Sequence, residues 1–337
     1  MSAYFRPLLN TDASRPVSAL ILVGGRLWFD HVEKLSRNSV AEILPVTALP
    51  NSWKERLCAP RTPIAGVAMK APSIMGILNL TPDSFSDGAK YKSTDEAVAQ
   101  AKQLTHMGAN FIDIGGESTR PGALEVPIAE EIRRIKPVIK KLRGITSVIS
   151  VDTRKAAVAE VAVALGARLV NDVSGFQFDP KLLPLCAAQS VSVCVMHSQG
   201  LPETMQNNPS YENVVLDIYD FLETQIVRLE SAGVPRSQII ADPGIGFGKT
   251  MRHNLALLQK ISLFHGLGVP LLLGMSRKGF IGKVTGEEEA QNRVIGSVAA
   301  AMFGASQGVQ VFRVHDVKET RQAFDMWQTT HFGDFYG

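Results

Sequence analysis

Eight short apolar runs in this chain are each followed directly by polar side chains that could hold a ligand. Carboxylates and amides stand there beside arginines, lysines and histidines, which together suit a small molecule with both a hydrogen-bonding edge and negative charge. Any single polar residue at a strand end is unremarkable, because strand ends commonly meet solvent. Their recurrence after all eight runs favours a shared site. The set is Asn79, Glu117 to Arg120, Asp152, Asn171, His197, Asp242, Ser276 to Lys278, Arg313 and His315.

The sequence shows no pattern typical of covalent catalysis. It lacks a GxSxG nucleophile with a downstream triad, and it lacks the HExxH zinc motif. The cysteines Cys58, Cys186 and Cys194 are odd in number and have no CxxC spacing, so we expect neither a disulfide framework nor a zinc site.

The apolar runs predict the strands of a parallel sheet. They alternate with longer stretches rich in Ala, Leu, Glu and Lys, which is the pattern of repeated strand-helix units. Eight such units with nearly continuous apolar strands favour a TIM (β/α)8 barrel over an open doubly wound sheet, and in that barrel the carboxyl ends of the strands carry the chemistry. The predicted strands are residues 73–78, 110–115, 147–152, 167–172, 192–197, 238–243, 270–275 and 309–314.

Helices are predicted between these strands. Residues 93–109 form one, with Ser93 as a capping residue and Gly108 as the stop signal. Further helices are expected within residues 156–167, 212–233 and 296–308.

The first 72 residues have a different character, with scattered prolines and only short apolar runs. We expect an appended element with a strand or two and a short helix near residues 28–35. It is too short and too often broken by proline to predict an independent core. The expected division is therefore an extension over residues 1–72 and a barrel over residues 73–337.

Bulk composition narrows the class of protein. Hydrophobic residues make up 45% and charged residues 20% of the 337, which is typical of a soluble protein with a large core. A net charge of +3 with no run of five basic residues favours neither nucleic acid nor a membrane surface as a partner. Without a signal peptide pattern or an apolar run of 18 residues, we expect a cytoplasmic location.

From Ser73 onward the chain resembles the dihydropteroate synthase family of pterin-binding TIM barrels. The resemblance lies in an ordered series of motifs on the predicted strands: MGILNLTPDSFSDG (75–88), DIGGESTRPGA (113–123), SVDT (150–153), VND (170–172), VMHSQG (195–200), ADPGIGFGK (241–249), GMSRK (274–278) and FRVHDV (312–317). It implies condensation of 6-hydroxymethyl-7,8-dihydropterin diphosphate with 4-aminobenzoate, giving 7,8-dihydropteroate and diphosphate.

The resemblance also implies which residues bind the pterin. A pterin has a donor-acceptor edge like that of guanine, so a buried site needs fixed carboxylates and amides. Lys278 donates to the carbonyl and a ring nitrogen, while the walls are formed by Met196 and Phe247. The edge is held by Asp152, Asn171 and Asp242.

For the diphosphate, the resemblance implies a cluster of donors and cations, together with Mg²⁺ bound weakly until the substrate arrives. Arg313 also lies flat against the ring, and Asp83 joins Asn79 at the metal. The diphosphate residues are Thr119, Arg120, Arg313, His315 and Asn79. The catalytic group is then Lys278, Arg313, Asp242 and Asn79.

For 4-aminobenzoate, the implied site uses Ser276 and the backbone around Arg277, with Phe85 and Pro121 as apolar faces once two loops fold over. The implied reaction is a substitution with SN1 character that needs no strong base, and the family further implies a homodimer and inhibition by sulfonamides.

Two departures and three alternatives remain. The extension is not part of the family pattern, and Ser198 stands where a second methionine is common. A pterin-dependent methyltransferase, moving a methyl group from methyltetrahydrofolate to a corrinoid protein, shares the acidic face but needs no arginines such as Arg120 and Arg313. A non-catalytic pterin-binding homologue stays open. A sugar-phosphate barrel enzyme would leave Asp152 and Asn171 without a role.

Overall fold

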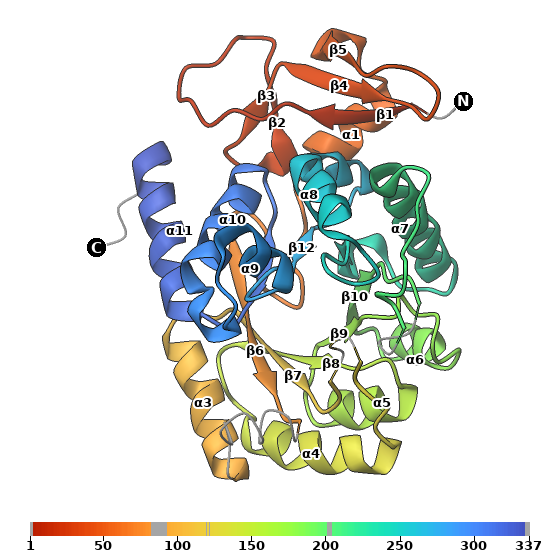
Figure 1. Cartoon of the computed structure of the whole chain (residues 1–337), viewed down its shortest axis with the longest axis vertical. Helices are drawn as coiled ribbons and strands as arrows, with labels where there is room; N and C mark the ends of the chain where they lie inside the picture. The colour runs from red at the N-terminus through yellow and green to blue at the C-terminus, as the bar shows by residue number, and fades with distance from the viewer. Residues whose placement is uncertain (1–2, 82–92, 119, 121, 201–203, 334–337) are drawn as a thin grey trace.

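A computed structural model of the chain describes residues 3–81, 93–118, 120, 122–200 and 204–333. Its main body is a ring of eight parallel strands inside a layer of helices (Figure 1). The two ends of the sheet meet through a single parallel bridge, Ala241 with Leu271, so the predicted TIM barrel is confirmed. In order around the ring the strands are β11 (Ile239–Asp242), β10 (Ser192–Met196), β9 (Leu169–Asp172), β8 (Val148–Asp152), β7 (Phe111–Gly115), β6 (Ser73–Asn79), β13 (Val311–Val314) and β12 (Leu272–Leu273).

The surrounding helices begin and end close to where the sequence predicts. In α3 the Ser93 hydroxyl accepts a hydrogen bond from the Glu96 amide at 3.2 Å, which confirms the predicted cap, and Gly108 follows the helix with a φ of +97°. The helices are α3 (Thr94–His106), α4 (Ile128–Lys141), α5 (Ala156–Ala164), α6 (Leu182–Ala188), α7 (Val214–Ser231), α8 (Met251–Gln259), α9 (Gly279–Thr285), α10 (Val294–Ser306) and α11 (Val317–Phe332). Buried apolar side chains of these helices, such as Ala101 of α3, Leu222 of α7 and Phe324 of α11, join the strands in one large core cluster.

Inside the barrel, the strand pleat separates an apolar floor from a polar layer. One residue of every barrel strand joins a single buried cluster: Met75, Phe111, Val148, Leu169, Cys194, Ile240, Leu272 and Val311. Because side chains two positions apart on a strand point to the same face, the next layer toward the carboxyl ends follows from the sequence. That layer is Ile77, Asp113, Ser150, Asn171, Met196, Asp242, Gly274 and Arg313.

The first part of the chain folds as a small β-rich element. A three-stranded antiparallel sheet of β1 (Tyr4–Pro7), β4 (His31–Leu35) and β5 (Glu42–Pro45) lies beside the pair β2 (Leu20–Ile21) and β3 (Trp28–Phe29). The helix predicted near residues 28–35 is therefore wrong. This segment is strand because β1 and β5 supply hydrogen bonds on both sides of β4, and the element's helix is instead α1 (Asn51–Cys58).

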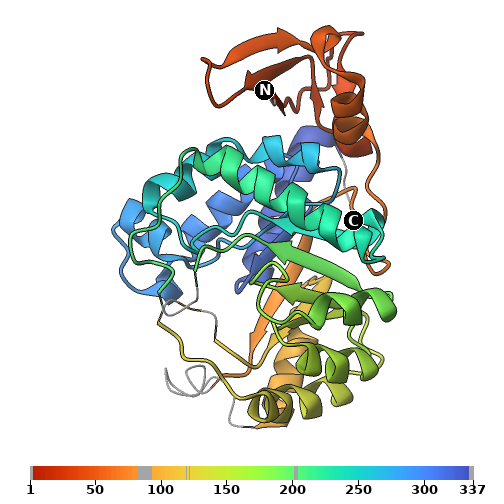
Figure 2. The same ribbon diagram turned by 90° about the vertical axis from the view of Figure 1, so that its right-hand side faces the viewer.

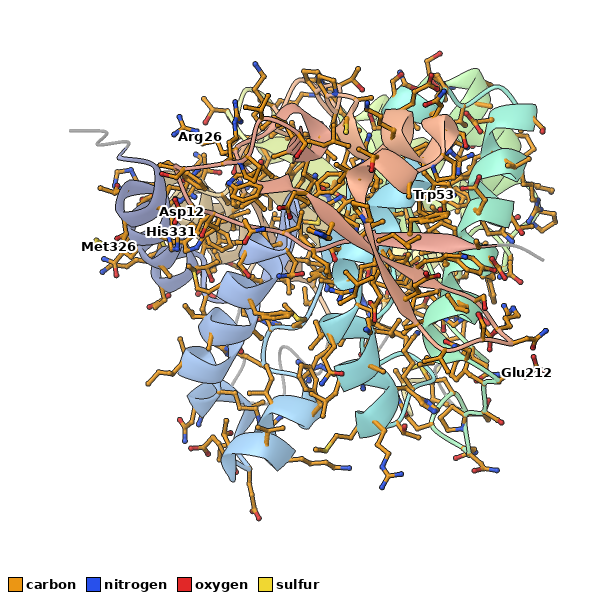
Figure 3. All side chains as sticks on the ribbon, turned by 90° about the horizontal axis from the view of Figure 1, so that it is seen from above. Asp12, Arg26, Trp53, Glu212, Met326 and His331 are labelled. Atoms are coloured by element: carbon orange, nitrogen blue, oxygen red, sulfur yellow. The ribbon has the colours of Figure 1, made fainter. Side chains whose placement is uncertain are left out.

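This N-terminal element sits at the end of the barrel from which β6 runs away (Figures 1 and 2). It has a small apolar cluster of its own around Phe29, Val32 and Leu57, with Trp327 and Phe332 of α11 packed against it. Seen from above, it stretches from the α11 side, where Asp12 and Arg26 lie on the same side of the molecule as His331, toward Glu212 on the opposite side (Figure 3). The connection to the barrel then inserts Ile64 and Met69, 0% and 2% exposed, into the floor cluster.

Within the described residues, no helix combines the length and apolar character that a bilayer crossing requires.

Candidate active site

A cavity of about 1400 Å³ opens at the carboxyl ends of the strands. His197, one of the strand-end residues, does not line it. The cavity does bring together all the described residues with a predicted role in binding or catalysis: Asn79, Arg120, Asp152, Asn171, Met196, Asp242, Phe247, Ser276, Lys278, Arg313 and His315. The remaining predicted residues lie outside the described part of the chain: Asp83, Phe85, Thr119 and Pro121.

Arg313 ties two strands of the cavity base together. Its Nε donates to Asp113 at 2.6 Å and its terminal nitrogen donates to Asp152 at 2.7 Å. Burial alone would lower the pKa of Arg313, but the carboxylates of Asp113 and Asp152 outweigh it and raise the pKa above its ordinary value. The guanidinium is therefore a permanent cation with a fixed plane.

Asp113 is a buried residue beneath the cavity that the sequence reasoning missed, and it holds two of the cavity's side chains. It is fully buried and accepts hydrogen bonds from Ser150 at 2.6 Å, Asn171 at 3.1 Å and Arg313. Since a carboxylate accepts but does not donate, Asn171 must turn its amide nitrogen toward Asp113 and leave its oxygen for a ligand. The signal was available, because Asp113 lies two residues after the floor residue Phe111 on the inward face of β7.

Asp152 is poised to receive a donor. Its Oδ2 accepts from Arg313, whereas its Oδ1 is buried and has no hydrogen-bond partner among the described residues. Burial raises the pKa of Asp152 to about 7, against the opposing pull of Arg313. A buried acceptor without a partner costs free energy, so a ligand that donates here is strongly favoured.

Asp242 and Lys278 face the other side of the cavity. Asp242 is anchored by the Gly244 amide at 2.7 Å, and Lys278 donates to the Ile245 carbonyl while its ammonium lies 4.5 Å from the centre of the Phe247 ring. Burial raises the pKa of Asp242 and lowers the pKa of Lys278 to about 8. The pair thus offers an acceptor and a donor whose charges are only partly stabilised before a ligand binds.

A second residue missed by the sequence reasoning, Lys249, fastens the loops after β10 and β11 together. Its Nζ lies 2.9 Å from Nδ1 of His197 and donates to the Phe247 carbonyl at 2.8 Å. Burial, followed by the nearby Lys249 charge, lowers the pKa of His197 to about 2, so this histidine is neutral. The motif that contains Lys249 was recognised, but nothing in the sequence indicates that Lys249 contacts His197, 52 positions earlier.

The rim carries the remaining predicted residues. The Ser276 hydroxyl accepts from the His315 amide at 3.1 Å and lies 3.0 Å from Nδ1 of the same histidine. Arg277, in the left-handed region with a φ of +61°, is held by an ion pair with Asp316. Ser276, predicted for aminobenzoate, and His315, predicted for diphosphate, are therefore adjacent. This is what a reaction requires in which aminobenzoate takes the place of diphosphate.

Comparison with known proteins agrees with this geometry. A family model described as pterin binding enzyme matches residues 75–315. Dihydropteroate synthase from Escherichia coli strain K12 is 44% identical over 260 residues, covering 77% of this chain and 92% of that protein. The residues before 75 lie outside the family match.

Solved structures superpose on the barrel. The Xanthomonas albilineans dihydropteroate synthase with 4-aminobenzoic acid is 43% identical, with a TM-score of 0.76 over 81% of this chain and 98% of that one. The Yersinia pestis enzyme with a sulfonamide drug is 44% identical, with a TM-score of 0.75 over 78% of this chain and 96% of that one.

Proposed function

The chain belongs to the pterin-binding enzyme family, among the dihydropteroate synthases, and we propose how its own residues perform that reaction. The substrates are 6-hydroxymethyl-7,8-dihydropterin diphosphate and 4-aminobenzoate, and the products are 7,8-dihydropteroate and diphosphate. The observation that carries the proposal is the juxtaposition in one cavity of buried acceptors, Asp152 and Asp242, with the fixed cation Arg313.

The acceptors recognise the pterin. The partnerless oxygen of Asp152, the oxygen of Asn171 and the carboxylate of Asp242 meet the amino and ring N–H groups of the heterocycle. Lys278 donates to its carbonyl and a ring nitrogen, and Phe247 and Met196 line the apolar faces. Bound donors stabilise the carboxylates that burial had made costly to ionise.

The cations hold the diphosphate and stabilise the charge that grows as its C–O bond breaks. Arg313 reaches the ring plane with one face, because Asp113 and Asp152 fix its orientation, and Arg120 and His315 lie toward the opening. Nothing in this set is a strong base, so the aniline nitrogen attacks a methylene that has gained cationic character, and its proton leaves afterwards.

The donor set also fits Mg²⁺ brought in with the substrate. Among the described residues no group of three or more His, Cys, Asp or Glu side chains could hold a metal ion. Asn79 and Asp152 flank Gly115 on the two neighbouring strands, and the Asn79 side-chain oxygen at the cavity is a hard donor of the kind that Mg²⁺ prefers. Asn79, and Asp83 beyond the described residues, would hold Mg²⁺, which supplies charge neutralisation on the diphosphate.

The second substrate enters above this group. Ser276 and the backbone at Arg277 are placed for the carboxylate of 4-aminobenzoate, and the neighbouring His315 keeps the Ser276 hydroxyl oriented. Phe85 and Pro121 are proposed as its apolar faces. Sulfonamides that mimic 4-aminobenzoate compete for the same position.

The test is direct turnover. Purified protein is incubated with the pterin diphosphate, Mg²⁺ and 4-aminobenzoate, and dihydropteroate and diphosphate are quantified. We expect both products in equal amounts, with inhibition by a sulfonamide that saturating 4-aminobenzoate relieves. A protein that binds the pterin without forming product is a non-catalytic homologue, and methyl transfer from methyltetrahydrofolate would identify the methyltransferase alternative.

Individual roles separate in variants. Asp242→Asn and Lys278→Ala are expected to abolish pterin binding, whereas Arg313→Ala mostly impairs the diphosphate step. Wild-type turnover in all three would exclude the site as assigned.

We propose three further features of the protein. Residues 1–72 serve the fold and residues 73–337 the reaction, because the N-terminal element contacts the barrel at the floor.

A homodimer forms through α10, whose Ile295 and Phe303 are 85% and 42% exposed on one helix face, and light scattering tests this. A cytoplasmic location suits the three free cysteines and is tested by cell fractionation.

A further inference from the structure

The segment that carries Arg120 leaves the barrel at Glu117 and returns at Val126, and buried charges hold both points. The Glu117 carboxylate accepts from the Val126 amide at 2.8 Å. Lys155 donates to the Val126 carbonyl at 2.5 Å and to Glu117 at 2.9 Å. Both backbone groups of Val126 are therefore held by side chains that are only 3% and 4% exposed.

Two more charges complete this group, which we call the loop clamp: Glu117, Glu131, Arg154 and Lys155. Lys155 also donates to Glu131 at 3.1 Å, and Glu131 accepts from the Thr153 hydroxyl at 2.7 Å. Arg154 donates to Glu117 at 3.1 Å and covers the Phe178 ring at 3.9 Å. Glu125 approaches Lys155 at 3.8 Å from the half-exposed side.

The loop clamp is a costly way to hold a protein together. Removing four charges from water is opposed by their desolvation, and apolar side chains of similar volume often stabilise as well or better. None of the four charges has a role in the proposed binding of pterin or 4-aminobenzoate. What apolar residues cannot do is hold a specific amide and a specific carbonyl, and the clamp does this at Val126.

The clamp also links the end of β8, which carries Asp152, to the segment that carries Arg120. Arg154 and Lys155 follow Asp152 in the chain by two and three residues, so their positions are set by the end of β8. Glu117 and Val126 bracket Arg120, and Gly116 between the strand and the clamp is held by Arg134, which donates to its carbonyl at 2.8 Å. A carbon added to Gly116 would lie 2.9 Å from Glu131, so the approach is tight.

We propose that Lys155 is a positioning residue for the diphosphate half of the reaction. By holding Val126 and Glu117 at the strand that carries Asp152, it fixes where Arg120 stands relative to the bound pterin. This role rests on the proposed function, because it takes Arg120 to bind the diphosphate. It does not extend to pterin recognition, which depends on residues at the strand ends.

The experiment compares two ligands that differ only in the diphosphate. Titration calorimetry measures binding of the pterin diphosphate and of 6-hydroxymethyl-7,8-dihydropterin, which lacks it. The variant Lys155→Met/Glu131→Gln removes one positive and one negative charge together, so the remaining Glu117 and Arg154 stay balanced. We expect affinity for the diphosphate ligand to fall roughly tenfold to hundredfold and affinity for the plain pterin to change less than about twofold.

The matched control is Glu131→Gln alone, which keeps Lys155 on Val126. It should lower thermal stability and leave the preference for the diphosphate ligand intact. Lys155→Met alone should show the same selective loss as the double variant, and if it does not fold, the double variant decides.

Three results would overturn the role. The Lys155 variants could lose affinity for both ligands to the same degree, they could lose affinity for neither, or Glu131→Gln alone could lose affinity selectively for the diphosphate ligand. Failure of the unaltered protein to bind either pterin would instead refute the proposed function from which the role follows.

Discussion

The two ends of the barrel are built from the same strands and differ in what they bury. At the floor, one apolar residue of each strand packs around Ile64 and Met69 from the N-terminal element. At the mouth, two residues further along each strand, carboxylates and cations are buried with incomplete partners and shifted pKa values. The apolar floor therefore stabilises the fold, and this stability offsets the cost of burying at the mouth the charged groups that are available for ligand binding.

The largest expected difference comes from removing a mouth charge. Lys278→Ala should lower kcat/KM by about 10³-fold or more, with pterin binding lost, because a preorganised donor to the pterin is removed. Its stability should change little or rise, since burial opposes the charged form of Lys278. Steady-state kinetics and thermal unfolding measure the two effects.

Lys260→Ala is the matched control from the other end. Lys260 pairs with Glu33 of the N-terminal element and lies away from the cavity. Turnover should be unchanged there. A large loss of stability in Lys278→Ala, or of turnover in Lys260→Ala, would contradict the division between mouth and floor.

At the floor, the sharpest change is Ile64→Ala. The side chain is fully buried among the floor residues, so its truncation should lower the free energy of unfolding by about 2–5 kcal/mol. Ile64→Val, which removes one methyl group, should cost only about 0.5–1.5 kcal/mol.

Turnover well below the unfolding temperature should be preserved in both variants, as measured by denaturant titration beside kinetics. If Ile64→Ala instead changed the KM for the pterin substrate without a stability loss, floor and mouth would not be separable.

The pH dependence of pterin binding tests the mouth alone. In the free protein burial raises the pKa of Asp152 to about 7, and bound pterin donors favour the carboxylate, so binding releases a proton below that pH. Affinity should therefore weaken by up to about tenfold for each pH unit below the Asp152 pKa. Above about pH 8 it should fall again as Lys278 loses its proton.

Calorimetry in two buffers with different ionisation heats measures the proton release. Asp152→Asn should bind more weakly and lose the acidic limb while keeping the alkaline one. An unchanged acidic limb in that variant would assign the titration to another group.

The sequence predicted the barrel and the mouth because their signals are local. Short continuous apolar runs that alternate with longer helical stretches favour strands covered on both faces, and the polar residue that ends such a strand lies at the carboxyl edge. Asp113 escaped because it stands inside an apolar run, where only the inward alternation from Phe111 marks it. The partners of Lys155 and Lys249 escaped because they come from other strand-helix units.

Residues 31–35 were predicted as part of a helix but form a strand. A short segment with apolar residues at irregular intervals fits a helix or a strand equally well, and the choice was made by pairing with β1 and β5. No pattern within the segment contains that information.

The smallest expected effect concerns the polar contacts of the N-terminal element. Arg37 donates to Asp217 and Asp220 of α7, but its side chain is 34% exposed, so solvent screens the pairs. Arg37→Ala should lower the free energy of unfolding by no more than about 1 kcal/mol, and less at high salt. Urea titrations at low and high salt measure this. A loss as large as that of Ile64→Ala would mean that ion pairs, rather than the apolar floor, hold the element on the barrel.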